Sequence, residues 1–247
     1  MQNFLSMCSF HIRLYVKNSY FLWLPIRCTI SFFLLQYVAA FASGGLDDPN
    51  IWLRAGVFGL WASATTAAGS VSYQRYQGTL SYLLNNTVGD KVSLAALLIP
   101  ASTFGLISFP LAWLCAAVAG LHPAGLGVQQ LAGILCLWLS AVVLDFAIAG
   151  FFVLSRNASI YEDLIFIPLL LLSGFLGTPS WMESVLSCFR WLLPLAPASS
   201  LILETTNALW LTVAQYCTGM IVWGCVAYFL SDWLLRKARQ RGEISIL

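Results

Sequence analysis

The sequence predicts an all-α integral membrane protein with six transmembrane helices. Of its 247 residues, 60% are hydrophobic and only 9% are charged, whereas a soluble domain of this length carries about 25% charged residues. The mean hydropathy of +0.82 argues against a water-soluble enzyme and against a disordered chain. A net charge of +2 supplies no basic surface for nucleic acid. We expect the whole chain, 1–247, to form a single transmembrane domain.

Charged residues mark the limits of the predicted spans. A helix needs about 20 apolar residues to cross the hydrocarbon core, so the long uncharged stretch 92–144 must contain two crossings, separated at Gly120–Gly127. The expected spans are 20–43, 51–72, 92–118, 129–153, 161–176 and 208–235.

The region between the fifth and sixth spans, 177–207, holds two shorter apolar segments separated by Pro194 and Pro197. They are Trp181–Leu193 and Ala198–Leu209, and neither is long enough for a comfortable crossing. We expect short re-entrant helices, which membranes allow where the backbone is buried against protein. An ordinary outer loop with two surface helices is the alternative.

The distribution of lysine and arginine predicts that both termini are cytoplasmic. With that orientation only Arg54 and Arg190 face outward, and Arg27 lies just inside the first span. The expected cytoplasmic cations are Arg13, Lys17, Arg75, Lys91, Arg156, Arg236, Lys237, Arg239 and Arg241.

Residues 1–18 predict an amphipathic helix that lies along the anionic inner leaflet. Two sets of residues recur at helical spacing: polar Ser6, Ser9, Arg13 and Lys17, and apolar Phe4, Cys8, Ile12 and Tyr15. A frayed start to the first span is the alternative.

Residues 76–88 join the second and third spans on the predicted cytoplasmic side. Tyr76, Leu80, Leu83 and Leu84 fall on one helical face, and Gln77, Ser81 and Asn85 on another. We expect a short helix on the membrane surface, entered through Gly78 and capped by Thr79. The alternative is that Gly78 and Thr79 form only a turn.

This segment resembles the signature of type-2 ABC exporter permeases, Glu-Arg-Glu-x-Gly-Thr-Leu-Glu-x-Leu-Leu-x-Thr-Pro-Val. Gln74, Tyr76 and Ser81 replace its three acids, and Asn86-Thr87 replaces Thr-Pro. The matching residues are Arg75, Gly78, Thr79, Leu80, Leu83, Leu84 and Val88.

A second segment resembles the Leu-Ser-Gly-x-x-x-Pro sequence that the same family has in its outward region. It comprises Leu172, Ser173, Gly174 and Phe175, followed by Pro179, and we expect the short fifth helix to end in a turn at Ser173-Gly174. The resemblance extends over all six predicted spans in order, including the N-terminal helix.

The resemblance implies a permease subunit of an ATP-driven exporter in a bacterial cell membrane. Such a subunit pairs with an identical or homologous permease and with two ABC ATPase subunits, which bind ATP and Mg. No lysine here follows a glycine, so no phosphate-binding loop is expected in this chain and it is not itself expected to be an enzyme. The residues implied in ATPase coupling are Arg75, Tyr76, Gln77, Gly78, Thr79, Leu80, Ser81, Leu83 and Leu84.

The strongly aliphatic spans favour an amphiphilic or lipid-linked cargo, such as a drug, an antibiotic peptide or a glycolipid. Two other functions remain open: an ion-coupled secondary transporter and a membrane assembly or immunity factor. An intramembrane serine protease is excluded, because the chain has no Gly-x-Ser-Gly sequence.

Asp145 is the only formally charged residue deep within a predicted span. A carboxylate at such a depth costs about 2.5–3.5 kcal/mol on insertion scales. Arg27 lies at a similar depth from the same side, about 12 Å at about 1.5 Å per residue, so we hypothesise that the two form an ion pair. A place on a substrate path and burial as a protonated acid are the alternatives.

No metal site is expected, because His11 and His122 are the only histidines and lie far apart in the sequence. The seven cysteines fall mostly within apolar runs without Cys-x-x-Cys spacing. We therefore expect them to be small buried hydrophobic residues.

Overall fold

The structure, a computed structural model, is a bundle of helices. Every regular element among the described residues is helical, which confirms the predicted all-α class. The described residues are 2–46, 48–84, 89–123, 125–154, 164, 167–176, 180–203 and 209–240.

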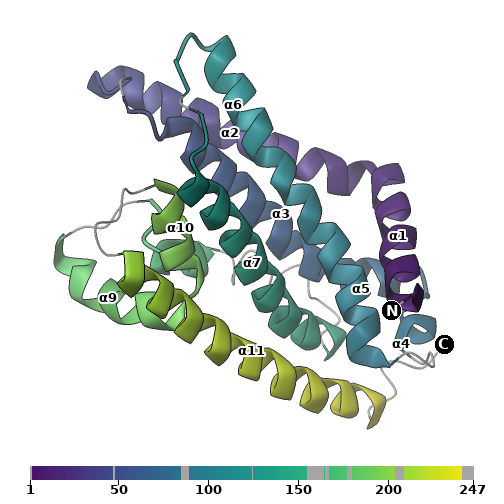
Figure 1. Ribbon diagram of the computed structural model, residues 1–247. Helices are drawn as coiled ribbons and strands as arrows, with labels where there is room; N and C mark the ends of the chain where they lie inside the picture. The colour runs from purple at the N-terminus through teal and green to yellow at the C-terminus, as the bar shows by residue number, and fades with distance from the viewer. Residues whose placement is uncertain are drawn as a thin grey trace.

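The elements follow one another along the chain as shown in Figure 1. They are α1 (Gln2–Lys17), α2 (Ser19–Ser43), α3 (Ile51–Tyr76), α4 (Leu80–Leu84), α5 (Asp90–Thr103), the 3₁₀ helix η1 (Phe104–Ile107), α6 (Ser108–Val118), α7 (Val128–Leu154), the 3₁₀ helix η2 (Ser180–Met182), α9 (Glu183–Leu192), α10 (Leu195–Leu203) and α11 (Leu209–Gln240).

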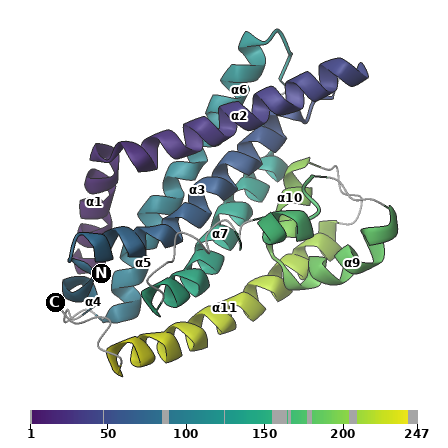
Figure 2. The ribbon, with the colours of Figure 1, turned by 180° about the vertical axis from the view of Figure 1, so that it is seen from behind.

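The long helices run between two ends of the bundle, which Figures 1 and 2 show from opposite sides. The α4 end contains α1, α4, the start of α5 and the last turns of α7 and α11. The α10 end contains α10, the 44–50 loop and the 119–127 loop. The segments predicted to share the cytoplasmic side therefore lie together at the α4 end.

Among the described residues, four helices are long and apolar enough to cross a membrane, and a fifth crossing is counted if α9 and α10 form one broken span. The four candidates are Ser19–Ser43, Asp90–Val118, Val128–Val153 and Leu209–Leu234. Each coincides with a predicted span. A multi-pass membrane protein follows, while the count of six remains a prediction.

The predicted second span, 51–72, forms α3 but is not among those apolar candidates. Helix α3 is enclosed by α2, α5, α6 and α7, and its alanines, glycines, serines and threonines let these neighbours approach closely. Small residues lower the hydropathy of a helix that seldom needs to face lipid. Helix α3 is therefore the central helix of the bundle, although its hydropathy is lower than that of the four candidate spans.

The predicted third span is one path built from three pieces: α5, η1 and α6. Pro100 lies inside α5, and the tighter η1 follows a few residues later. A proline removes a helical hydrogen bond and a 3₁₀ turn re-satisfies part of the backbone. At Gly105 in η1, a side chain would meet the backbone of Leu60 in α3 at 3.0 Å, so the break brings two backbones together.

The predicted fifth span, 161–176, is described only in part. Residues 161–163, 165 and 166 lie outside the described residues, and a helix over 167–172 ends in a turn at 173–176.

Helices α9 and α10 form the two short apolar segments predicted between the fifth and sixth spans, but α10 starts earlier than expected. Helix α10 begins at Leu195 and not at Ala198, because Pro197 fits the first turn of a helix, where its missing N–H is not needed. The α9 and α10 pair bends by 104° and is either a broken span or a re-entrant loop. Helix α10 is almost wholly buried.

The cysteine prediction is wrong. None of the seven is fully buried: Cys188, Cys217 and Cys225 are exposed, and Cys8, Cys28, Cys115 and Cys136 are half-buried. Apolar runs in a membrane protein include outward-facing positions, so a run alone does not predict burial inside the protein.

The tightest glycine contact joins α2, α3 and α6. A methyl group added at Gly59 would lie 2.0 Å from the Thr29 hydroxyl and 2.5 Å from the Ser108 hydroxyl. Both of these polar side chains are fully buried. Gly59 is therefore required for the three helices to meet at this separation.

We predict that Gly59→Ala destabilises the protein by about 1–3 kcal/mol, the usual cost of overpacking. Gly224→Ala in α11 is the matched control, because a side chain there meets nothing within 4 Å. Thermal unfolding of both variants in one detergent measures the difference. Equal melting temperatures for the two variants would contradict the packing.

Candidate functional site

The turn between α3 and α4 is the candidate site that the sequence indicates. Helix α3 ends at Tyr76, and Gly78 adopts a left-handed backbone conformation with φ of +70°. Only glycine adopts this conformation without appreciable strain. The Gln77 side chain donates to the Tyr73 hydroxyl at 2.7 Å. The predicted turn at Gly78 is therefore present.

Thr79 ties this turn back to α3. Its hydroxyl donates to the backbone carbonyl of Gln74 at 3.2 Å and also to the Gln74 side-chain carbonyl. Its backbone carbonyl accepts from Leu83 at 3.0 Å. The hydroxyl thus joins two helices, whereas the sequence predicted that it would cap α4.

Helix α4 is anchored by one side and exposed on the other. Leu80 is 3% exposed and packs in a cluster with Val71 of α3 and Leu94 of α5, with Leu83 partly buried against the same cluster. Tyr82 is 68% exposed, and Tyr76, just before the turn, is 89% exposed. Two aromatic side chains are therefore exposed on the protein surface at this end.

The predicted coupling segment 76–88 is only partly described. The side chains of Ser81 and Leu84 and all of 85–88 lie outside the described part of the chain, so their predicted roles stay predictions. Within the described residues, helix α4 comprises Leu80–Leu84.

Arg75 connects the turn to another membrane-spanning helix. Its guanidinium donates to the backbone carbonyl of Val153, in the last turn of α7. A cation at this position also interacts favourably with the negative end of the helix dipole. Movement of the α3–α4 turn is thereby linked to α7.

Helix α1 packs on α5, and His11 and Tyr15, four residues apart on α1, are both buried. The Tyr15 hydroxyl donates to the Leu97 carbonyl at 3.2 Å, and its ring lies 4.3 Å from that of Phe21. Burial raises the pKa of Tyr15 and lowers the pKa of His11.

The exposed side of α1 is itself amphipathic. Arg13 and Lys17 are exposed, and so are Leu5, Ile12 and Val16. The predicted face containing Ile12 and Tyr15 is therefore divided, because Tyr15 is buried whereas Ile12 is exposed. The sequence spacing did not predict that His11 is buried.

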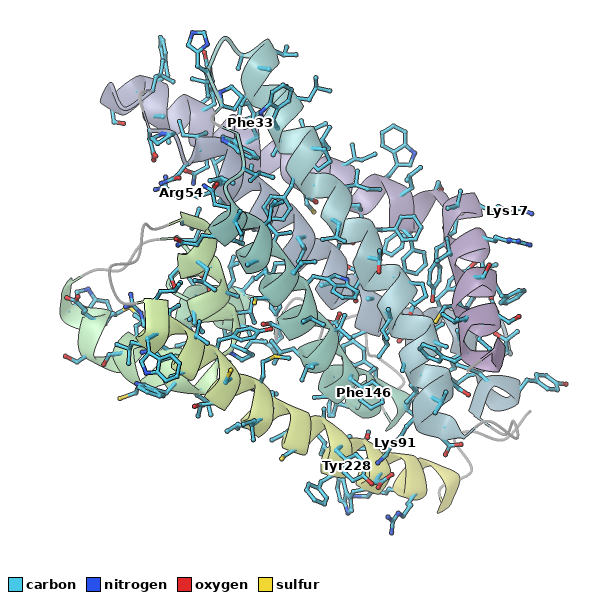
Figure 3. The ribbon with its side chains drawn as sticks, viewed as in Figure 1. Lys17, Phe33, Arg54, Lys91, Phe146 and Tyr228 are labelled. Atoms are coloured by element: carbon cyan, nitrogen blue, oxygen red, sulfur yellow. The ribbon has the colours of Figure 1, made fainter. Side chains whose placement is uncertain are left out.

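A second connection at the α4 end was not foreseen from the sequence. Lys91, in the first turn of α5, forms a 3.0 Å ion pair with Asp232 of α11 and lies 3.2 Å from the centre of the Tyr228 ring (Figure 3). Tyr228 and Asp232 are four residues apart and share a helical face. The four-residue spacing of Tyr228 and Asp232 is the sequence feature that could have indicated a shared binding face for a cation.

The hypothesis of an ion pair between Arg27 and Asp145 is wrong. Arg27 is exposed on α2, and the ion pairs within the described residues do not include it. Asp145 is 0% exposed and accepts a 2.9 Å hydrogen bond from Ser102 of α5. Since α3 packs against both α2 and α7, equal depth did not make these two side chains neighbours.

The second matching segment forms a helix end. Gly174 is left-handed with φ of +69°, and the Ser173 hydroxyl donates to Leu170 at 2.6 Å. The Phe175 ring is buried 5.8 Å from that of Phe32 in α2. The predicted end of the fifth helix at Ser173–Gly174 is therefore observed, whereas Pro179 lies outside the described residues.

Comparisons of the chain with models of protein families, with curated proteins and with solved structures returned no significant match. Within the described residues, no group of three or more His, Cys, Asp or Glu side chains is placed to hold a metal ion.

We predict that the docking of α1 is weakened by acid. Because burial lowers the pKa of His11 from 6.5, the undocked helix binds the proton more tightly than the docked one. Docking is therefore fully favourable above about pH 6.5 and is weakened as the pH falls below that value.

Hydrogen exchange of the α1 amides at pH 7.5 and pH 5.5 measures this effect. Exchange should accelerate at pH 5.5, after correction for intrinsic rates, and His11→Leu should remove the difference. His122→Leu is the control, because His122 lies at the α10 end. Loss of the pH dependence in both variants would contradict the assignment to His11.

We also predict that Ser102→Ala and Asp145→Asn are not additive in stability, because the two side chains share a hydrogen bond. Such bonds in membrane proteins contribute about 0.6 kcal/mol on average. Arg27→Ala combined with Asp145→Asn should be additive. Thermal unfolding of the single and double variants tests both statements, and the reverse pattern would restore the ion-pair hypothesis.

Proposed function

We propose that this chain is the membrane-spanning permease subunit of an ATP-driven exporter, with its α4 end in the cytoplasm of a bacterial cell. It pairs with an identical or homologous permease and is driven by two separate ABC ATPase subunits that bind ATP and Mg. The cargo is an amphiphilic or lipid-linked molecule. The α3–α4 turn is the observation that carries the proposal.

This turn has the two properties that a mechanical coupling element needs. Its outer surface is available for docking, since Tyr76 and Tyr82 are exposed. Its inner surface is attached to the bundle through Leu80, Thr79 and Arg75. A force applied by a docked subunit would pass to α3, α5 and α7 together.

Gln74 and Tyr76, which replace two acids of the family signature, lie in different surroundings. Gln74 replaces an acid but is buried and bound by Thr79, so it serves the turn and not the partner. Tyr76 replaces the other leading acid and is almost fully exposed. The ATPase surface is therefore proposed to meet an aromatic side chain here instead of a carboxylate.

Helix α1 fits the same proposal as an interfacial helix. Its exposed side combines Arg13 and Lys17 with the apolar Leu5 and Val16, which suits the boundary of an anionic leaflet. Its buried side holds α5 through Tyr15. The helix thereby positions the bundle against the cytoplasmic membrane surface.

One observation favours an ion-coupled secondary transporter as a second candidate. Asp145 lies fully buried in α7 and accepts a hydrogen bond from Ser102, and intramembrane carboxyl groups often belong to ion pathways. Transport that continues in vesicles without ATP and stops in Asp145→Asn would favour this candidate over the exporter.

We predict that Tyr76→Asp combined with Tyr82→Asp abolishes co-purification of an ABC ATPase that is recovered with the unmodified chain. Since both side chains are exposed, the melting temperature should not change. Trp181→Asp is the matched control, because Trp181 is also exposed but precedes α9. Full ATPase recovery with the double variant would contradict the docking surface.

We further predict that Gly78→Ala weakens ATPase binding several-fold. An L-residue in the left-handed region costs about 1–2 kcal/mol, and relief of that strain would displace α4. Gly44→Ala provides the control: Gly44 has φ of +72° and equally open surroundings, but it lies at the α10 end. Binding measured by surface plasmon resonance should separate the two variants, and equal affinities would count against the coupling role.

A further inference from the structure

Arg27 is a cation on the surface of a helix that is apolar enough to cross the membrane. It lies eight residues after Ser19, the first residue of α2, which is about 12 Å along the helix at about 1.5 Å per residue. Its side chain is exposed, and no ion pair within the described residues includes it. A cation that faces hydrocarbon is unfavourable unless an anion or the lipid headgroups reach it. Arg27 therefore calls for a negatively charged partner on the outer surface of α2.

The face of α2 that contains Arg27 is polar and aromatic toward α1. Four exposed residues recur on it at spacings of three and four, which is the spacing of neighbours on one helical face: Tyr20, Trp23, Arg27 and Ser31. The buried residues of α2, such as Phe21 and Thr29, lie on its other side. Tyrosine and tryptophan are typical of the boundary between headgroups and hydrocarbon, where the ring is in apolar surroundings and its O–H or N–H can donate.

The same face becomes apolar beyond Ser31. Leu34, Leu35 and Val38 are all exposed, by 54%, 64% and 62%, and they continue the helical spacing toward the end of α2. This helix runs from α1 at the α4 end to the 44–50 loop at the α10 end (Figures 1 and 2). Polar groups near α1 followed by aliphatic side chains match the order of headgroup and acyl chain in one leaflet.

The charges of α1 and α2 are exclusively positive. Residues 1–46 contain no Asp or Glu, and their cations are Arg13, Lys17 and Arg27. Lys17 is the last residue of α1 and is exposed where α1 meets α2 (Figure 3). An anion that contacts Arg27 therefore meets no negative side chain on either helix, and Lys17 adds to its attraction.

A second copy of this chain offers Arg27 no suitable carboxylate among the described residues. Asp48 and Asp232 already form ion pairs, and Asp145 is 0% exposed. Asp90 and Glu183 are the first residues of α5 and α9, at the ends of the bundle. Lipid phosphates, in contrast, are present all around α2 in the leaflet that meets the α4 end. The charge of Arg27 thus favours a lipid over a second copy.

We propose that the outward face of α2 binds an anionic phospholipid from the leaflet that meets the α4 end. The Arg27 guanidinium donates to its phosphate, which arginine can bind through two parallel hydrogen bonds. The Trp23 indole donates to the headgroup, and an acyl chain lies along Leu35 and Val38. The site depends on α2 crossing the membrane and not on ATPase docking or on the identity of the cargo.

The test uses the full chain in detergent with equal amounts of phosphatidylglycerol and phosphatidylcholine that have the same acyl chains. Native mass spectrometry measures how much of each lipid remains bound. Arg27→Gln removes the charge and Arg27→Lys keeps it. Arg190→Gln on α9 is the matched control, because Arg190 is also exposed and no ion pair within the described residues includes it.

We expect the unmodified chain and Arg190→Gln to retain at least five-fold more phosphatidylglycerol than phosphatidylcholine. Arg27→Lys should keep at least half of this preference, and Arg27→Gln should lower it at least three-fold. Equal retention of the two lipids by the unmodified chain, or a preference that Arg27→Gln leaves unchanged, would overturn the proposal.

Two further outcomes of the same measurement also decide against a lipid. Glycerol 3-phosphate added at the concentration of phosphatidylglycerol should not displace it, and full displacement would replace the lipid by a free phosphate compound. A dimer that dissociates only in Arg27→Gln, with an unchanged lipid ratio, would place Arg27 between two copies of the chain.

A second variant keeps the proposal testable if Arg27→Gln does not fold. Ser31→Asp leaves Arg27 in place but puts a carboxylate one helical turn away, where it can pair with the guanidinium and repel a phosphate. Ser43→Asp, at the last residue of α2, is its control. The preference for phosphatidylglycerol should fall at least three-fold in Ser31→Asp alone. An unchanged preference in that variant would show that the lipid does not bind at Arg27.

Discussion

The structure depends on the enclosure of α3 by its neighbours. In a bilayer the association of helices relies on close contact, since lipid tails are as apolar as leucine side chains. Gly59 permits the contact with Thr29 and Ser108, and Gly105 brings η1 against the backbone of Leu60. The other long helices are arranged around this packed centre, and the α3–α4 turn takes its position from it.

The two ends of the bundle are held together by different polar contacts. At the α4 end, polar side chains join helices that are far apart in the sequence: Arg75 reaches α7, and Lys91 reaches α11. At the α10 end, Asn50 and Gln129 hold a short buried helix by its carbonyl groups. The first end links an exposed turn to the spans, and the second holds α10 against α3 and α7.

Local features could be predicted because they depend on a few neighbouring residues. Gly78 and Gly174 adopt left-handed turns where the motifs indicated them, since this preference is a property of glycine itself. The start of α10 was misplaced because Pro197 can enter a first turn as well as precede one. The burial of the cysteines was misjudged because an apolar run does not say which side of its helix faces protein.

The sequence by itself determined the helical class, the positions of the four most apolar spans and the turns at Gly78 and Gly174, because hydropathy and glycine conformation are local properties. Only the tertiary structure decided that Asp145 meets Ser102 and that Lys91 meets Asp232. Such partners depend on which helices are neighbours and on how each is rotated about its axis. Uniformly apolar helices carry little pattern that specifies either, so these contacts emerge only when the whole bundle is packed.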